Sequence, residues 1–191
     1  MVNGVAYSTA NGGVMSFDGV DDRVSIVNSK YIYSNQPFTL SAWVNLSAFT
    51  STHPTIFSLN SDGNGYWVCL SNRVSYLGLY FGAESVFSRF KTNTPASYFL
   101  NKWVQITITY DGVNPASVNS FKAYINNVDT AFNAGSPMAN NNKSSLIGWR
   151  SDDVTAARFN GKINDTIIYS RALTPEEVNQ NFNATKSKYG L

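Results

Sequence analysis

The chain has 191 residues, of which 43% are hydrophobic and only 14% are charged. This length fits one β-sandwich domain with a buried core. The formal net charge is +2 and no run of Lys or Arg occurs, so we expect neither nucleic acid nor anionic lipid as a partner. No segment approaches the roughly 20 apolar residues that a membrane helix needs, which excludes membrane insertion by a helix. The single cysteine, Cys69, excludes an intrachain disulfide.

Short runs of alternating apolar and polar residues, separated by turn residues, follow one another from Gly13 to Ser170. The run Phe38–Leu46 is the clearest, and it has the pattern of a half-buried strand. One face carries Phe38, Leu40, Ala42, Val44 and Leu46, and the other carries Thr39, Ser41, Trp43 and Asn45. Many short strands at this spacing predict an antiparallel sandwich or barrel.

The first turn of this series, within Phe17–Ile26, contains three carboxylates, Asp18, Asp21 and Asp22. Asp18 precedes Gly19, a pair that favours a tight turn in which the Asp side chain accepts a backbone hydrogen bond. We therefore predict a structural turn between two strands. The alternative left open is a structural calcium site, since clustered carboxylates in a tight loop are suitable ligands.

Three later runs place aromatic residues on outward faces. If Tyr66, Val68 and Leu70 face the core, Trp67 points outward. The same alternation applies to the two following runs. The outward residues are Trp67, Tyr76, Tyr80 and Tyr124. We predict that they share one sheet face. Exposed aromatic rings among Asn, Gln and Thr suit either a glycan or a protein partner, and both alternatives stay open.

One helix is predicted close to the end of the chain. Thr174 can serve as N-cap, Pro175 occupies the first helical position, and Glu177 completes a capping box. Val178 and Phe182 are four residues apart and so lie on one face. We expect this helix to pack against the sandwich through these two side chains.

The sequence does not predict an enzyme. Its one histidine, His53, lies in a loop directly before Pro54, and its only glutamates are Glu84, Glu176 and Glu177. Retaining glycosidases align two carboxylates about 5 Å apart, in this fold class on one strand face. No strand here carries such a pair, and one His with one Cys cannot form a zinc site.

Several segments, in this order, carry a resemblance to a known family: "FDGVDDRVSI", "FTLSAWVNL", "NKWVQITITYDG", "KAYINN" and "GKINDTIIYSRALTPEEV". Together they resemble laminin-G-like, concanavalin A-like jelly rolls, the superfamily that includes pentraxins, over about residues 14 to 182. The resemblance implies an all-β, two-sheet antiparallel jelly-roll sandwich with one short C-terminal helix. We expect a single domain over residues 1–191, with an N-terminal arm at about 1–13 and a C-terminal tail at about 184–191.

The resemblance to pentraxins also implies a calcium-dependent ligand site, built from the loops after "TIFSLN" and "SSLIGW". The sequence assigns no cofactor, and calcium is the one candidate. Trp149 and Arg150 stand where pentraxins have a glutamate and a glutamine, which argues against strong metal binding, and the alternative is that the two loops are structural Asn/Asp turns. Trp149 and Arg150 are also counted with the glycan- or partner-contacting set. The matching loop residues here, candidate calcium ligands, are Asn60, Asp62, Asn64, Asp152 and Asp153.

The final residues, "NFNATKSKYGL", resemble the tails of laminin-G-like proteins in virions of tailed bacteriophages. This implies a non-catalytic virion surface protein, a capsid decoration, fibre or knob component. It would dock on other virion proteins or on itself and bind host-surface polysaccharide. The N-terminal residues lack the basic and apolar segments of a secretion signal, as expected of a protein released by lysis. The alternative is a free, extracellular lectin-like module of a cellular protein.

Overall fold

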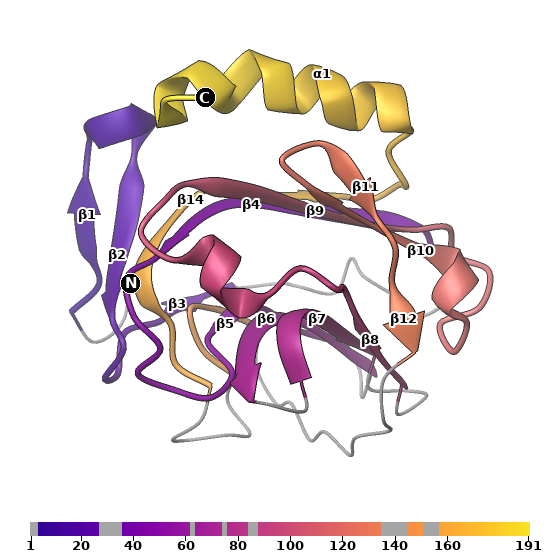
Figure 1. Cartoon of the computed structure of the whole chain (residues 1–191), viewed down its shortest axis with the longest axis horizontal. Coiled ribbons are helices and arrows are strands. Elements are labelled where there is room, and N and C mark those ends of the chain that lie inside the picture. The colour runs from indigo at the N-terminus through magenta and orange to yellow at the C-terminus, as the bar shows by residue number, and fades with distance from the viewer. Residues whose placement is uncertain are drawn as a thin grey trace.

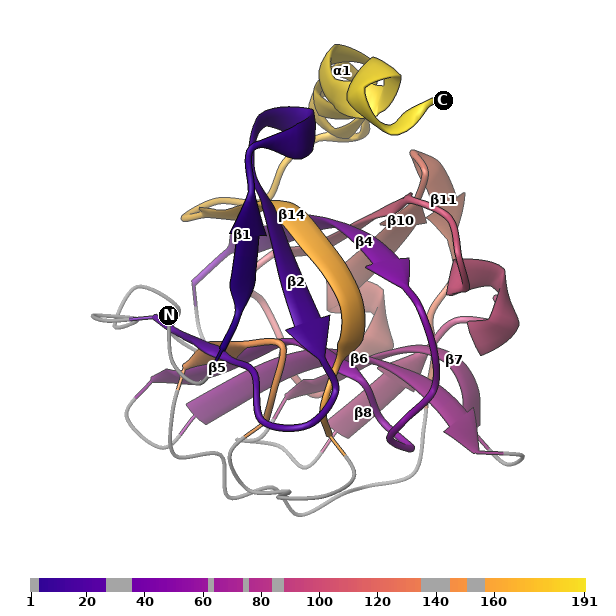
Figure 2. The same cartoon turned by 90° about the vertical axis from the view of Figure 1, so that its left-hand side faces the viewer.

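The computed structural model describes residues 4–26, 36–61, 64–73, 76–83, 88–134, 145–150 and 157–191. Two antiparallel sheets pack face to face, and the helix α1 (Pro175–Thr185) lies across the outer face of one of them (Figures 1 and 2). The predicted all-β jelly-roll sandwich with one short C-terminal helix is confirmed. None of the helices in the described residues is long and apolar enough to cross a membrane.

The first sheet joins the two ends of the chain, because the last strand lies between two early ones. In spatial order its strands are β1 (Ala6–Ser8), β2 (Val14–Asp18), β14 (Asn160–Tyr169), β4 (Phe38–Leu46), β9 (Val104–Tyr110), β10 (Phe121–Ile125) and β11 (Val128–Thr130). Part of the expected N-terminal arm is thus β1, which pairs with β2.

The second sheet consists mostly of strands from the middle of the chain, and the early strand β3 lies at one of its edges. In spatial order its strands are β12 (Asn133–Ala134), β8 (Ser88–Lys91), β7 (Tyr76–Ala83), β6 (Asn64–Arg73), β5 (Thr55–Ser61), β13 (Leu146–Ile147) and β3 (Val24–Ser25). Short 3₁₀ helices occur at Ala10–Gly12, Ala96–Phe99, Val118–Ser120 and Lys186–Tyr189.

The main core lies between the sheets and follows the predicted alternation. The five residues predicted to face inward from the Phe38–Leu46 run all belong to it. The Phe38 ring contacts Tyr66 of the facing sheet, with 4.8 Å between ring centroids, and Tyr110 of its own sheet at 5.3 Å. Such edge-to-face and tilted pairs add to the stabilisation from area burial alone.

A second buried layer lies between the outer face of the first sheet and α1 (Figure 1). The ring of Trp43 stacks on Tyr189 and Phe182, with centroid distances of 4.1 and 5.7 Å. Its indole nitrogen donates a hydrogen bond to Thr185 Oγ1 at 3.1 Å. Val178 is buried as well, so the prediction that Val178 and Phe182 face the sandwich is confirmed. The expected tail thus ends in a 3₁₀ helix whose Tyr189 belongs to this layer.

The start of the helix is fixed by side-chain bonds. Thr174 Oγ1 accepts from the Glu177 amide at 3.3 Å, and the Glu177 carboxylate accepts from the Thr174 amide at 2.9 Å. This is the predicted capping box. Thr39 of β4 holds the preceding segment, because its hydroxyl donates to the Arg171 carbonyl and accepts from the Leu173 amide, both at 2.9 Å.

Candidate functional site

The predicted aromatic platform is wrong as a single surface. Trp67 lies in β6 of the second sheet and Tyr124 in β10 of the first, so they cannot share a sheet face. Both side chains are only 3% exposed. Tyr76 and Tyr80 lie in β7, beside β6, but their side chains are outside the described part of the structure. Alternation gives the direction of a side chain relative to its own sheet, and neither the sheet nor what covers it.

Trp67 does point away from the main core, as the alternation predicts. With Cys69 it forms a separate buried cluster, whereas Tyr66 and Val68 of the same strand belong to the main core. The guanidinium of Arg150, itself only 2% exposed, lies 5.0 Å from the centre of the Trp67 ring. This arrangement is a cation–π contact in a packed layer.

Trp149 lies half-buried beside this layer, with two guanidinium groups over its ring. Those of Arg23 and Arg158 lie 4.6 and 5.4 Å from the ring centre. A ligand contact by Trp149 or Arg150 stays a prediction. The calcium set implied by pentraxins also stays a prediction, because Asp62, Asp152 and Asp153 and the side chains of Asn60 and Asn64 lie outside the described residues.

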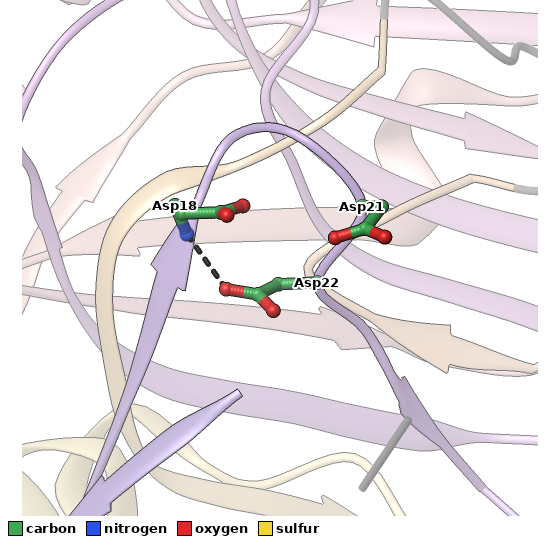
Figure 3. A group of neighbouring side chains, drawn as sticks. All are labelled: Asp18, Asp21 and Asp22. Carbon is green, nitrogen blue, oxygen red and sulfur yellow. Dashed lines mark hydrogen bonds between the residues drawn. The ribbon is translucent and has the colours of Figure 1, made fainter. Parts of the chain in front are cut away.

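The acidic turn, Asp18–Asp22, brings its three carboxylates together (Figure 3). One oxygen from each of Asp18, Asp21 and Asp22 lies within 4.8 Å of the others. The Asp18 carboxylate accepts from the Val20 amide at 2.7 Å, as the predicted Asx-type turn requires, and Gly19 has a positive φ of 79°. The structural role predicted for Asp18 is therefore confirmed in its geometry.

Asp22 is the unusual member of the acidic turn, because it is only 7% exposed. Its Oδ2 accepts from the Asp18 amide at 2.8 Å, whereas its buried Oδ1 has no hydrogen-bond partner within the described residues. Burial raises the pKa of the Asp22 carboxyl; the bond from the Asp18 amide opposes this, and the neighbouring charges of Asp18 and Asp21 add to the rise. Three close carboxylates with one unsatisfied oxygen fit a hard cation with oxygen ligands.

A second candidate site lies where α1 begins, above strands β10 and β11. We call it the Tyr124 groove. It consists of two hollows of about 320 and 150 Å³, which share Tyr124 and Pro175. The larger is lined by Tyr124, Asn127, Asp129, Pro175, Glu176 and Asn179. The smaller is lined by Thr109, Asp111, Asn119, Ser120, Lys122, Tyr124, Ala172, Leu173 and Pro175.

The groove depends on a tight hairpin and on the docked helix. Ile125 and Val128 pair across the hairpin, and Asn126 and Asn127 between them have φ of 49° and 66°. Positive φ at both positions is what a two-residue type I′ turn requires, and Asn tolerates it well. The side-chain amide of Asn127 donates a hydrogen bond to Asn179 Oδ1 of α1 at 2.7 Å. This bond bridges the hairpin and the helix.

Tyr124 separates the two hollows. Its ring packs against Leu173 and Val178, and its hydroxyl is buried with no hydrogen-bond partner among the residues described. Burial raises the pKa of this hydroxyl, and the nearby charges of Asp129 and Glu176 raise it further, so Tyr124 is a neutral phenol at neutral pH. A buried hydroxyl without a partner costs about 1–3 kcal/mol, which a ligand that reached it would recover.

Sequence reasoning found Tyr124 by alternation but missed the groove around it. Asn127, Asp129, Glu176 and Asn179 come from a hairpin and a helix that are about 50 residues apart in sequence. The only local signals were the Asn-Asn pair and the helix start. Neither indicates that the two segments meet.

Comparison with known proteins places the chain among lectin-like folds. The family model described as "Concanavalin A-like lectin/glucanases superfamily" matches residues 18–179. No curated protein is significantly similar in sequence.

Among solved structures, domain 4 of AbnA, an extracellular arabinanase from Geobacillus stearothermophilus in complex with arabinotriose, is similar with a TM-score of 0.60 and 20% identity. That match covers 93% of this chain and 81% of the arabinanase chain. A structure of botulinum neurotoxin type C, described as entering cells through two ganglioside molecules, has a TM-score of 0.62 and 16% identity. It matches 95% of this chain, which spans only 45% of the toxin chain. At these identities the likeness shows the fold.

Proposed function

Because the chain belongs to the concanavalin A-like lectin/glucanase superfamily, we propose that it is a non-catalytic carbohydrate-binding domain. Family membership alone does not decide function, since one fold carries many sites. The observation that carries the proposal is the Tyr124 groove, with its buried, unsatisfied hydroxyl. The arabinotriose and ganglioside ligands named for two similar structures are consistent with it.

The groove has the chemistry that a sugar requires. The carboxylates of Asp129 and Glu176 accept hydrogen bonds. Asn127 Oδ1 and Asn179 Nδ2 take no part in the bond between these two side chains, so they can accept and donate respectively. A volume of about 320 Å³ is at the lower end of the range for small-molecule sites. A short glycan segment with several hydroxyls matches such a site better than a wholly apolar ligand.

The same groove argues against hydrolysis. A glycosidase needs one carboxylic acid whose pKa is raised, so that it can protonate the leaving oxygen. The pKa of Glu176 is instead lowered, first by a hydrogen bond from its own backbone amide and then by Thr174. Glu176 is therefore ionised at neutral pH and suits hydrogen-bond acceptance rather than acid catalysis.

A glycan array tests the proposed function. We expect the domain to bind a glycan on the array and to release no reducing ends from it. Asp129→Ala and Glu176→Ala should each weaken binding about tenfold, as loss of a charge-assisted hydrogen bond does. Ser97→Ala, at an exposed residue of a 3₁₀ helix elsewhere, is the matched control. Binding to no glycan, or binding that both groove variants retain, would contradict the proposal.

We propose the virion surface of a tailed phage as the setting, with docking on other virion proteins or on further copies of this chain. The support is the resemblance of residues 181–191 to virion proteins. Co-sedimentation of the protein with purified particles of a phage that encodes it tests this setting. A protein that stays in the supernatant would favour the alternative, a free extracellular lectin-like module.

The acidic turn is proposed as a calcium site. The support is the close approach of Asp18, Asp21 and Asp22 and the unsatisfied Oδ1 of Asp22. A bound ion stabilises the folded state by mass action, so we expect melting several degrees higher in calcium than in chelator. Asp21→Asn should remove this difference, and Asp129→Asn, outside the turn, should retain it. Equal melting of the parent protein in both conditions would leave the turn purely structural.

A further inference from the structure

The charges that line the Tyr124 groove differ from the charge of the whole chain. The chain has a formal net charge of +2. Among the residues that the structure describes, those lining the larger hollow include two carboxylates, Asp129 and Glu176, and no cation. The smaller hollow adds Asp111 and one cation, Lys122. Interactions between exposed charges are screened beyond about 8–10 Å, so a bound ligand experiences the local carboxylates rather than the net charge.

The arginine close to the helix start is already engaged, and the cation whose charge helps to lower the pKa of Glu176 is Lys122 of the smaller hollow. The Arg171 guanidinium forms two hydrogen bonds to the Glu177 carboxylate, at 2.6 and 2.8 Å. Arg171 is also absent from the lining of both hollows. Neither carboxylate of the larger hollow is therefore neutralised by this arginine.

The helix N-terminus does not supply an anion site either. Free amides and the helix dipole make such ends attractive to anions. Here Pro175 has no amide proton, and the Glu177 amide is used by Thr174 Oγ1. The acidic Glu176 and Glu177 occupy the first turn and already complement the dipole. An incoming carboxylate or sulfate would be repelled by these carboxylates, and the described helix start offers it no free amide.

Resting on the proposed carbohydrate-binding function, we propose that the Tyr124 groove selects glycans without acidic groups. Sialylated, uronate-bearing and sulfated chains are rejected at this site, and neutral sugar segments are taken. The carboxylates of Asp129 and Glu176 accept hydrogen bonds from sugar hydroxyls, which donate without bringing a negative charge. Tyr124 lines both hollows and brings no charge to either of them.

The test is an array on which each neutral glycan is printed beside its sialylated, uronate or sulfated form. The GM1 oligosaccharide and its asialo form are one such pair. We expect the neutral member of a pair to bind at least tenfold more tightly. The double variant Asp129→Asn plus Glu176→Gln should tighten binding of the acidic member about tenfold, since two like-charge contacts in a solvated groove are worth about that much.

A control separates local charge from net charge. Ser97→Lys plus Ser187→Lys changes the net charge by the same amount, but both serines are exposed and neither lines the groove. We expect this variant to keep the preference of the parent protein. Equal improvement in both double variants would overturn the proposal, because only net charge would then matter.

The remaining outcomes distinguish this inference from the function on which it rests. Preferential binding of acidic glycans by the parent protein would overturn the selectivity and leave carbohydrate binding in place. Binding to no member of any pair would overturn both. Amide resonances of Asn127, Asp129 and Asn179 that shift when the preferred neutral glycan is added support the location, and shifts confined to other residues contradict it.

Discussion

Trp43 and Trp67 occupy comparable positions on the two sheets, yet they are buried in different ways. Each points away from the main core, and neither is more than 3% exposed. Trp43 is covered by α1, through stacking on Phe182 and Tyr189. Trp67 forms a small cluster with Cys69 beneath the Arg150 guanidinium. Only the cover of Trp43 is a regular secondary-structure element, α1, and the start of that helix is marked in the sequence by its capping box.

The difference explains where the candidate site lies. A straight helix on a twisted sheet cannot cover the whole outer face evenly. The Tyr124 groove is found where α1 begins, over β10 and β11, whereas Trp43 lies under its last turns. The outer face of the first sheet thus has hollows of about 320 and 150 Å³ where α1 begins, and a smaller one of about 80 Å³ beside Trp43 under the last turns of the helix.

The strongest test of the comparison is Trp43→Ala. It removes two ring stacks and the hydrogen bond to Thr185, so we expect a loss of about 3–5 kcal/mol in the free energy of unfolding. Proteolytic cleavage within α1 should also become faster. Chemical denaturation and limited proteolysis measure the two effects. A stable variant with a protected helix would show that α1 is held elsewhere.

Trp67→Ala should cost somewhat less, about 3 kcal/mol, because the cavity is lined partly by flexible side chains that can relax. The rate of cleavage within α1 should not change, since Trp67 belongs to the other sheet. The same two measurements compare it with the Trp43 variant. If α1 became sensitive to protease in both variants, the two outer faces would not be independent.

Thr174→Ala tests how far the helix cover depends on its cap. The substitution removes the acceptor for the Glu177 amide, and loss of such a cap costs about 1 kcal/mol. Thr174→Ser keeps the acceptor and serves as control. Thermal denaturation should rank the parent and the Ser variant together, above the Ala variant. An Ala variant as stable as the parent would mean that packing alone places the helix.

The smallest expected effect is the pH dependence of stability caused by Asp22, which is buried in the acidic turn, outside the covers of Trp43 and Trp67. Its pKa in the folded state is raised above the ordinary 3.8, so the folded protein binds the proton more tightly than the unfolded chain. In chelator, its contribution to stability should therefore decline as the pH rises from the ordinary value through the raised one. Asp22→Asn should abolish this decline.

Melting of the parent and of Asp22→Asn at about pH 3 and about pH 7 measures the effect. The parent should lose stability relative to the variant at the higher pH. With calcium bound, the sign should reverse, because the ion favours the ionised carboxylate. If the parent instead became more stable relative to Asp22→Asn as the pH rises in chelator, Asp22 would have a partner that offsets its burial.

Much of this structure follows from local patterns in the sequence. The alternation in Phe38–Leu46 gave the inward residues of β4, because a strand has only two faces and the core accepts only one. The residues from Thr174 to Glu177 gave the start of α1, because a capping box satisfies the first amides within four residues. The Asp18-Gly19 pair gave its turn for the same local reason.

What only the tertiary structure decided is which segments meet and what they cover. Alternation sends Trp43, Trp67 and Tyr124 outward, and all three are buried, by elements far away in the chain. The groove is formed where a hairpin at Asn126–Asn127 meets a helix that begins at Pro175. Neither the hydrophobic periodicity nor the helix cap predicts that these two segments meet. Periodicity and capping act over a few residues, whereas the position of α1 on the sheet depends on packing summed over the whole outer face.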